Sequence, residues 1–487
     1  MTGLLPFFRL TKKRTIAMTK CDVGLVGLAV MGRNLVLNLE EKGFRVAVFN
    51  RTASKTEAFL AGEAKGKKIE GAYGPGDFAA LLERPRVILL MVKAGEAVDK
   101  AIAALLPHLE EGDILMDGGN SFFKDTERRA RELEEKGIHF LGVGISGGEE
   151  GARFGPSIMP GGSRAAWERV EPMLRAAAAK VEGEPCVAWL GKGGAGHYVK
   201  MVHNGIEYGE MQLLAEAYDL LRRGLGYSFE RMAALFGRWN EGILSSFLVE
   251  ITARILEKKD PETGKMLVEV ILDRAGQKGT GKWTAEECLE RGVPMPALFS
   301  ALEMRMLSGR KEERTRAARI LRLDPGKSFE GDRDGVERDL ENALYLARIC
   351  GYAQGLSLLR EAGRACGYDW DLAQIARIWR GGCIIRAGVL EKIRAVFEED
   401  PGLENLLLHP ETAAGAAGRV PALRRTLTLG AELGIPLPAL SATLSFLDAY
   451  RSAVLPANLI QAQRDYFGAH TFERVDKKGA FHADWQS

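Results

Sequence analysis

Residues 21–32 read CDVGLVGLAVMG, and this stretch decides the fold of the first part of the chain. Residues 21–26 are mostly apolar and bounded by turn residues, which predicts a buried strand. The strand runs directly into a turn with GxAxxG spacing. The first Gly allows a tight turn, the small second residue lets a pyrophosphate approach the backbone, and the third lets helix and strand pack closely. We therefore expect a dinucleotide to bind at this helix start, against Gly27, Leu28, Ala29, Val30, Met31 and Gly32.

Short strands and helices continue to alternate up to about residue 194. Apolar, strand-length runs occur at 45–49, 87–92 and 114–117, and helix-like stretches occur at 32–42 and 124–136. This alternation predicts an α/β, Rossmann-like, doubly wound sheet over residues 18–194. Residues 1–17 form a segment with a net positive charge. We expect it to be a disordered N-terminal extension, with a targeting segment as the alternative.

Beyond residue 194 the strand pattern gives way to helical periodicity. We expect a large all-α domain over residues 195–453 and an extended C-terminal tail over residues 454–487. Within the helical part, LLAEA at 213–217 recurs as LLREA at 358–362, and GYSF at 226–229 recurs as GYDW at 367–370. This spacing indicates a duplicated helical unit. Chance similarity between Leu- and Ala-rich helices is the alternative.

The composition excludes several classes of protein. The 67 basic and 65 acidic residues give a net charge of +2, which argues against binding nucleic acid through a broad basic face. Apolar runs are too short to span a membrane. The six cysteines contain no CxxC pair, which is typical of buried free thiols in a reducing compartment. We expect a cytoplasmic protein.

The end of the second strand indicates which dinucleotide binds. NAD enzymes usually place Asp or Glu there to accept a hydrogen bond from the ribose 2′-hydroxyl. This chain has Asn50, Arg51 and Thr52 instead. A guanidinium and a hydroxyl can bind a 2′-phosphate, which a carboxylate would repel. NADP is therefore the expected cofactor.

A polar stripe follows the glycines at 193–196. Lys200, His203, Asn204 and Glu207 stand at i, i+3, i+4 and i+7, so they share one face of the predicted helix. A solvated polar face is the alternative. The opposite face is apolar, however, which indicates a buried helix, where an unpaired Lys and Glu would be costly. Because of that cost, a functional role is the better explanation.

Seven motifs together resemble the 6-phosphogluconate dehydrogenase family. They are GLAVMGRN at 27–34, GGNS at 118–121, ISGGEEGARFGPSIMPGG at 145–162, KMVHNGIEY at 200–208, GQKGTGKW at 276–283, WRGGCIIR at 379–386 and LPANLIQAQRDYFGAHT at 455–471. The resemblance covers everything except the N-terminal extension. Phe122 and Phe123 depart from it, because a more polar pair is expected there.

The resemblance implies an NADP-dependent oxidative decarboxylation of 6-phosphogluconate to ribulose 5-phosphate, a step of the pentose phosphate pathway and of gluconate utilisation. Lys200 would be the general base and Glu207 the general acid, without a metal. For this chemistry Lys200 must be neutral, so its pKa must fall well below about 10.4.

The same resemblance implies the remaining site residues. Cofactor contacts would also involve Val92, Lys93, Ala94 and Asn120. The substrate's carboxylate and hydroxyls would meet Asn120, Ser146, Gly147, Gly148, His203 and Asn204, and its phosphate would meet Tyr208, Lys278, Thr280, Arg305 and Arg464. His470 would also approach the substrate. The protein would be a homodimer, with the tail bringing Arg464 and His470 into the neighbouring subunit's site.

Two other functions are compatible with parts of the sequence. A β-hydroxyacid dehydrogenase of the hydroxyisobutyrate type shares the glycine turn, the Ser-Gly-Gly loop and the lysine, but it is shorter and lacks the tail. A non-catalytic NADPH-binding regulator would not need Lys200 and Glu207. The presence of both residues favours an enzyme.

Overall fold

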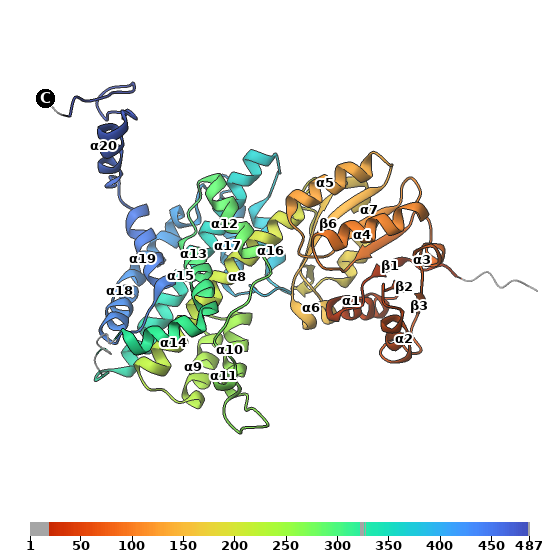
Figure 1. Ribbon diagram of the computed structural model, residues 1–487, viewed down its shortest axis with the longest axis horizontal. Helices are drawn as coiled ribbons and strands as arrows, with labels where there is room; N and C mark the ends of the chain where they lie inside the picture. The colour runs from red at the N-terminus through yellow and green to blue at the C-terminus, as the bar shows by residue number, and fades with distance from the viewer. Residues whose placement is uncertain (1–18, 322–325, 327, 486–487) are drawn as a thin grey trace, which may run out of the picture.

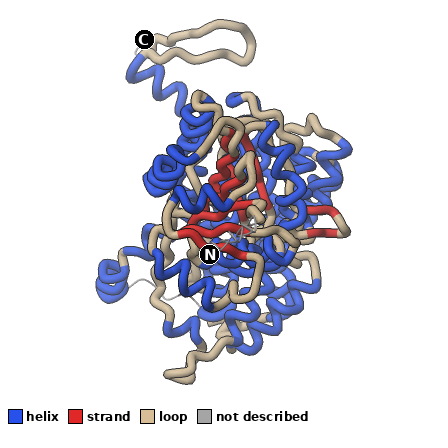
Figure 2. Tube along the Cα trace, turned by 90° about the vertical axis from the view of Figure 1, so that its right-hand side faces the viewer, coloured by secondary structure: helices blue, strands red, loops and turns tan. Residues whose placement is uncertain are grey.

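The computed structural model describes residues 19–321, 326 and 328–485. The expected N-terminal extension, residues 1–17, lies outside the described residues. Figure 1 shows an α/β part on one side, a larger helical part on the other, and helix α20 (Ala457–Gly468) projecting from the helical part at its far end. Figure 2 shows the strands gathered into a sheet with helices around it.

The main sheet has seven strands in the order β3-β2-β1-β4-β5-β6-β7. Strands β1 to β6 run parallel, and β7 is antiparallel to β6. The strand order reverses between β1 and β4, and ligands bind in the crevice at such a reversal. The strands are β1 (Val23–Val26), β2 (Val46–Phe49), β3 (Ile69–Ala72), β4 (Val87–Leu90), β5 (Ile114–Asp117), β6 (His139–Ile145) and β7 (Ile158–Gly162).

The helices of this part connect the strands and cover the sheet. They are α1 (Val30–Glu41), α2 (Ala53–Ala61), α3 (Pro75–Leu81), α4 (Glu96–Leu105), α5 (Phe123–Glu134), α6 (Gly148–Phe154) and α7 (Arg164–Ala177). The four expected strands correspond to β1, β2, β4 and β5, and the expected doubly wound sheet is confirmed. Strands β3, β6 and β7 were not predicted, because glycines or a proline interrupt their apolar pattern.

Helix α8 (Ala195–Asp219) leads from the sheet into the helical part. Its start packs closely on β6, because a Cβ atom added to Gly144 would lie 2.5 Å from the Lys200 Cβ atom. The remaining helices are α9 (Phe229–Glu241), α10 (Phe247–Glu257), α11 (Leu267–Val270), α12 (Thr280–Arg291), α13 (Pro296–Gly309), α14 (Lys311–Ile320), α15 (Arg333–Cys366), α16 (Leu372–Trp379), α17 (Val389–Glu399), α18 (Pro410–Glu432) and α19 (Pro438–Tyr450).

The two copies of the sequence repeat occupy equivalent positions in this helical part. LLAEA lies in α8 and LLREA in α15, and each long helix is followed by a packed pair of shorter helices, α9 with α10 and α16 with α17. Ser228 and Asp371 cap the first short helix of each pair by accepting backbone N–H bonds. The arrangement of the helices therefore supports a duplicated unit.

The C-terminal tail contains more regular structure than expected. Residues 457–468 form α20, and the chain then folds back on it. The buried Asp465 carboxylate accepts hydrogen bonds from the backbone N–H groups of Thr471 (3.0 Å) and Ala483 (3.1 Å) and from Trp485 Nε1 (2.8 Å). Helix α20 was not predicted within the tail, because a helix with little core to cover has only weak apolar periodicity.

Among the described residues, no helix is long and apolar enough to cross a bilayer. The six cysteines are free thiols, and all but the half-buried Cys366 are buried.

Candidate active site

The glycine turn has the geometry that the GxAxxG spacing predicts. Gly27 has φ +107°, and a Cβ atom added to it would lie 2.4 Å from the Met91 carbonyl oxygen. A Cβ atom added to Gly32 would lie 1.9 Å from the Gly27 carbonyl oxygen. Both positions therefore require glycine, and α1 starts directly after the turn, at Val30. This shape leaves room for a pyrophosphate beside the first turn of α1.

Asn50 connects the end of β2 to the glycine turn. Its Oδ1 atom accepts a hydrogen bond from the Leu28 N–H (3.1 Å), and its Nδ2 atom donates to the Thr52 carbonyl (3.1 Å). The neighbouring Arg51 is exposed, and it makes no hydrogen bond or ion pair with any residue in the described part of the chain. The Asn50 side chain thus fixes the turn, while the Arg51 guanidinium stays available for an anion such as a 2′-phosphate.

The other expected cofactor residues come from the same edge of the sheet. Val92, Lys93 and Ala94 follow β4, and Asn120 follows β5. The carboxyl ends of parallel strands meet at one edge, so these loops lie beside the glycine turn, on the other side of the strand-order reversal. The residues around the crevice therefore fit an NADP molecule.

Lys200 lies in a closed polar cluster at the contact between α8 and β6. Its side chain is buried, and Nζ donates to Asn204 Oδ1 (2.6 Å) and to Ser146 Oγ (3.3 Å) and lies 3.3 Å from His203 Nδ1. Burial lowers the pKa of Lys200 below its usual value, and the nearby Glu207 carboxylate only partly opposes this shift. The amine is thereby brought toward its neutral, basic form.

His203 holds this cluster together. Its Nε2 atom lies 3.2 Å from Ser146 Oγ, and its Nδ1 atom lies 3.0 Å from Asn204 Oδ1. The ring is fully buried and packs edge-on against Trp379, with ring centroids 5.8 Å apart. Burial lowers the pKa of His203 well below 6.5, and the Lys200 charge lowers it further. The lowered pKa favours a neutral imidazole, which connects Ser146 in the loop after β6 to Asn204 on α8.

Glu207 lies on the same face of α8, farther along the helix. Its Oε2 atom lies 3.8 Å from His203 Nδ1. Burial raises the pKa of this carboxyl above its usual value, and Lys200 and Arg305 oppose the shift. The predicted stripe of Lys200, His203, Asn204 and Glu207 is therefore one continuous group, with the pKa of the amine shifted down and that of the carboxyl shifted up. Opposite shifts of this kind suit a base and an acid acting in one reaction.

The Ser-Gly-Gly loop forms the wall of this group. Gly147 and Gly148 have φ values of +108° and +61°, and a Cβ atom added to Gly147 would lie 2.5 Å from the Gly382 carbonyl oxygen. Ser146 itself is held by its N–H, which donates to the Ser157 carbonyl (3.0 Å). The backbone can follow this path only with glycine at these positions.

The start of α12 brings the predicted phosphate residues toward α8. The Arg305 guanidinium lies over the Tyr208 ring, 3.5 Å from its centroid. Thr280 is the buried first residue of α12, and the exposed Lys278 lies two residues before it. A Cβ atom added to Gly281 would lie 2.4 Å from the Tyr208 ring. Tyr208 directly follows Glu207 on α8, so Arg305 of α13 and the start of α12 both meet α8 beside Glu207.

Arg464 and His470 are not part of this cluster within one chain. Both are exposed on and after α20, and Arg464 Nη1 donates to Gln461 Oε1 (3.0 Å) on the same helix. Figure 1 shows α20 projecting away from the helical part, far from the junction with the sheet.

Three residues near the cluster were not predicted from the sequence. Trp379 and Cys383 are fully buried beside His203 and Lys200, and the Gly382 carbonyl receives the Ser157 N–H (2.7 Å). All three lie in WRGGCIIR, a motif noted for its resemblance and given no role. Because WRGGCIIR was one of the seven motifs that carry the family resemblance, its residues could have been expected to lie near the site.

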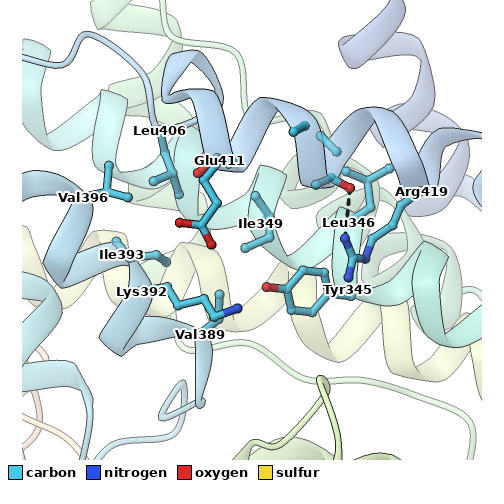
Figure 3. A pocket seen from close by; sticks show the side chains of 14 residues that line it. Tyr345, Leu346, Ile349, Val389, Lys392, Ile393, Val396, Leu406, Glu411 and Arg419 are labelled. Carbon is cyan, nitrogen blue, oxygen red and sulfur yellow. Dashed lines mark hydrogen bonds between the residues drawn. The ribbon is translucent and has the colours of Figure 1, made fainter.

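A separate cavity of about 340 Å³ lies in the helical part between α15, α17 and α18. Apolar side chains such as Leu346, Ile349 and Ile393 line it, and Figure 3 shows Lys392, Glu411 and Tyr345 at its edge. None of the expected cofactor, substrate or catalytic residues lines this cavity.

Comparisons with known proteins cover nearly the whole chain. The model of the NAD binding domain of 6-phosphogluconate dehydrogenase matches residues 22–191, and the model of the 6-phosphogluconate dehydrogenase C-terminal domain matches residues 196–485. The NADP(+)-dependent, decarboxylating 6-phosphogluconate dehydrogenase of Bacillus subtilis is 53% identical over 96% of this chain and 100% of its own length. The decarboxylating enzyme of Ovis aries is 51% identical over 96% of this chain and 97% of its own.

A solved structure agrees with the sequence comparisons. The Plasmodium falciparum 6-phosphogluconate dehydrogenase, studied with its cofactor NADP+ and its substrate 6-phosphogluconate, superposes with a TM-score of 0.92 at 45% identity, over 96% of this chain and 100% of that chain. A shorter hydroxyisobutyrate-type enzyme would leave the second half unmatched, so that alternative is set aside. The chain belongs to the family of decarboxylating 6-phosphogluconate dehydrogenases.

Proposed function

We propose that this protein oxidises and decarboxylates 6-phospho-D-gluconate to D-ribulose 5-phosphate and CO₂, with reduction of NADP to NADPH. The observation that carries this proposal is the buried stripe on α8. Lys200 there has a lowered pKa and three polar neighbours, and Glu207 has a raised pKa. Lys200 lies where the start of α8 packs on β6, and Glu207 follows it on the same face of α8.

Lys200 acts as the general base. Its neutral amine takes the proton of the substrate's C3 hydroxyl, and bound NADP supplies the hydride acceptor for the hydrogen on C3. Asn204 and Ser146 hold Nζ in place before the proton arrives. Once protonated, the ammonium polarises the new C3 ketone, which draws the electrons of the C1–C2 bond as CO₂ leaves.

Glu207 acts as the general acid. Loss of CO₂ leaves an enediol whose former C2 carbon, which is C1 of the product, must be protonated to give ribulose 5-phosphate. A carboxyl with a raised pKa still carries its proton at pH values where an ordinary Glu has lost it. The Lys200 ammonium gives its proton to the C3 oxygen as the enediol forms, and the neutral amine takes that proton back when Glu207 protonates the carbon. Solvent then removes the proton from Lys200 and restores the proton of Glu207.

The substrate is held at both ends. Asn120, Ser146, Gly147, Gly148, His203 and Asn204 bind the carboxylate and hydroxyls in this proposal, and Tyr208, Lys278, Thr280 and Arg305 bind the phosphate. The support is their convergence: Ser146, His203 and Asn204 surround Lys200, and Arg305 lies over Tyr208. The cofactor site consists of the glycine turn and Arg51, with residues 18–194 as its domain and 195–453 as the domain that binds substrate.

The direct test is an assay of the purified protein with 6-phosphogluconate and NADP. NADPH and CO₂ should appear in equal amounts, and gluconate without the phosphate should be a poor substrate. Formation of NADPH without CO₂ would instead indicate a simple β-hydroxyacid dehydrogenase.

Arg51 should determine the preference for NADP. Arg51→Glu should raise KM for NADP by about 100-fold and leave KM for NAD within about twofold, because a carboxylate repels the 2′-phosphate. The measurement is the ratio of kcat/KM for the two cofactors. Lys55→Glu is the matched control, because it makes the same charge change on the exposed side of α2. An unchanged ratio in Arg51→Glu would contradict the role.

We also propose a homodimer in which the tail, residues 454–487, completes the neighbouring subunit's site. The support is that Arg464 and His470 lie far from Lys200 within one chain and that α20 exposes large apolar side chains, including Leu459 and Phe467 at 62% and 72%. Exposed apolar surface of this kind is typical of a contact with another chain.

Mixed dimers test this exchange. Lys200→Met chains and Arg464→Ala/His470→Ala chains should each be inactive alone. In a mixed dimer one site receives both lesions and the other receives neither. Random mixing of equal amounts should therefore restore about a quarter of the wild-type activity, since half of the dimers are mixed and each has one intact site. Absence of restored activity would show that each tail serves its own chain.

A further inference from the structure

Side chains at the start of α5, in the sheet part, contact the helical part. Phe122 precedes the first residue of α5, and its ring lies against the indole of Trp283 on α12, with ring centroids 5.0 Å apart and planes 30° apart. Two neighbours strengthen the same contact. Phe123 packs edge-on against Tyr198 of α8 at 4.7 Å, and Lys124 Nζ lies 3.1 Å from the buried carboxylate of Glu287 on α12. Three consecutive side chains of the cofactor domain thus contact the substrate domain.

Trp283 also packs against the start of its own helix, α12. A Cβ atom added to Gly279 would lie 3.4 Å from the indole, so the ring lies beside the backbone that precedes Thr280. Gly279 has φ +104° and caps α12 without a side-chain hydrogen bond. Thr284 Oγ1 also donates to the Met201 carbonyl of α8 (2.8 Å) and to the Thr280 carbonyl (2.9 Å). The start of α12 is therefore held by these hydrogen bonds and by the packing of Trp283, whose ring Phe122 covers.

On the other side, Phe122 is tied to the loop after β5. Asp117 accepts hydrogen bonds from the Gly119 N–H (3.0 Å) and from Ser121 Oγ (2.6 Å), which fixes the loop that carries Asn120. Asn120 and Phe122 are separated by one residue. The loop that carries Asn120 and the ring of Phe122 thus connect the end of β5 to the segment that contains Lys278 and Thr280.

We propose that Phe122 is a positioning residue, which sets the start of α12 through Trp283 and thereby the affinity for the phosphate of 6-phosphogluconate. This inference rests on the proposed function, since it assigns the substrate phosphate to the start of α12. It gives a role to Phe122, whose aromatic character departs from the polar pair expected at 122–123. Phe122 touches neither substrate nor cofactor in this proposal.

Two measurements on Phe122→Ala test it. Amide hydrogen exchange over residues 279–284 should become at least about tenfold faster, because the helix start loses its support. KM for 6-phosphogluconate should rise by about tenfold, with kcat and the Kd of NADP within about twofold, because misplaced groups weaken binding without removing the base or the acid. Phe122→Tyr keeps the ring and should restore wild-type values. Leu289→Ala, on an exposed position of the same helix, is the control and should change neither measurement.

A second variant shows whether the effect passes through the phosphate site. If Phe122 acts through the start of α12, adding Phe122→Ala to Lys278→Ala should raise KM less than it does in the wild-type background. Full additivity, unchanged exchange in Phe122→Ala, or faster exchange with an unchanged KM would each overturn the inference. Should the wild-type protein not turn over 6-phosphogluconate at all, the proposed function fails, while the exchange measurement still decides whether Phe122 holds α12.

Discussion

Lys200→Met should lower kcat by about 10⁴-fold while the Kd of NADP stays within about twofold of the wild-type value, because the general base is lost and the glycine turn is untouched. Met fills the buried space of the Lys side chain without leaving a charge. The polar cluster would lose one donor, shared by Ser146 and Asn204, and those two side chains keep His203 as a partner. Steady-state kinetics and calorimetric titration with NADP measure the two quantities.

Lys200→Arg separates proton transfer from positive charge. A guanidinium stays protonated at any pH at which the protein is folded, so it can polarise a ketone but cannot take the C3 hydroxyl proton. We expect this variant to be as inactive as Lys200→Met. Lys192→Met, on the exposed loop before α8, is the matched control and should keep wild-type kinetics. More than a tenth of wild-type kcat in either Lys200 variant would refute the proposed base.

Glu207→Gln should lower kcat by about 100-fold to 1000-fold, because the amide cannot donate a proton to C1. Hydride transfer and loss of CO₂ do not need this proton. The variant should therefore release about one NADPH per site in a rapid first phase and then turn over slowly. Stopped-flow absorbance of NADPH measures the burst, and Glu241→Gln, on an exposed position at the end of α9, is the control. A missing burst would assign Glu207 to the first step instead.

The pH profile gives a second measurement for the same pair. At low pH Lys200 is protonated, and the lowering of its pKa by burial moves this acid limb to lower pH than for a free lysine. At high pH Glu207 loses its proton, and the raising of its pKa by burial moves this alkaline limb above that of a free glutamate. Wild-type activity should thus be bell-shaped in pH, and Glu207→Gln should lack the alkaline limb, because Gln does not titrate.

Several features of this protein could be predicted because they are local. The GxAxxG turn forces a left-handed Gly27 and a Gly32 in contact with the Gly27 carbonyl. The i, i+3, i+4, i+7 spacing places Lys200, His203, Asn204 and Glu207 on one face of α8, whatever packs against it. Both predictions depend only on the backbone of one element.

Other features were missed because the sequence pattern there reflects close packing. Strand β6 carries Gly142 and Gly144 within its apolar run, and added Cβ atoms at these positions would lie 2.8 Å from His197 Nδ1 and 2.5 Å from Lys200 Cβ. These glycines weaken the strand signal and at the same time let α8 approach the sheet. The contact that weakens the strand prediction is the one that buries Lys200.

The dinucleotide turn, the alignment of four polar groups on one face of α8 and the division into an α/β and a helical part could be predicted from the sequence, because they follow from backbone geometry and periodicity over a few turns. The roles of base and acid were implied by the family resemblance. Three contacts could not be predicted in this way and became visible in the folded chain: Ser146 and His203 enclose Lys200, Trp379 and Cys383 lie behind them, and Phe122 stacks on Trp283. Those contacts join residues tens to hundreds of positions apart. Burial and the pKa shifts that follow from it arise only when such distant segments pack together and exclude water.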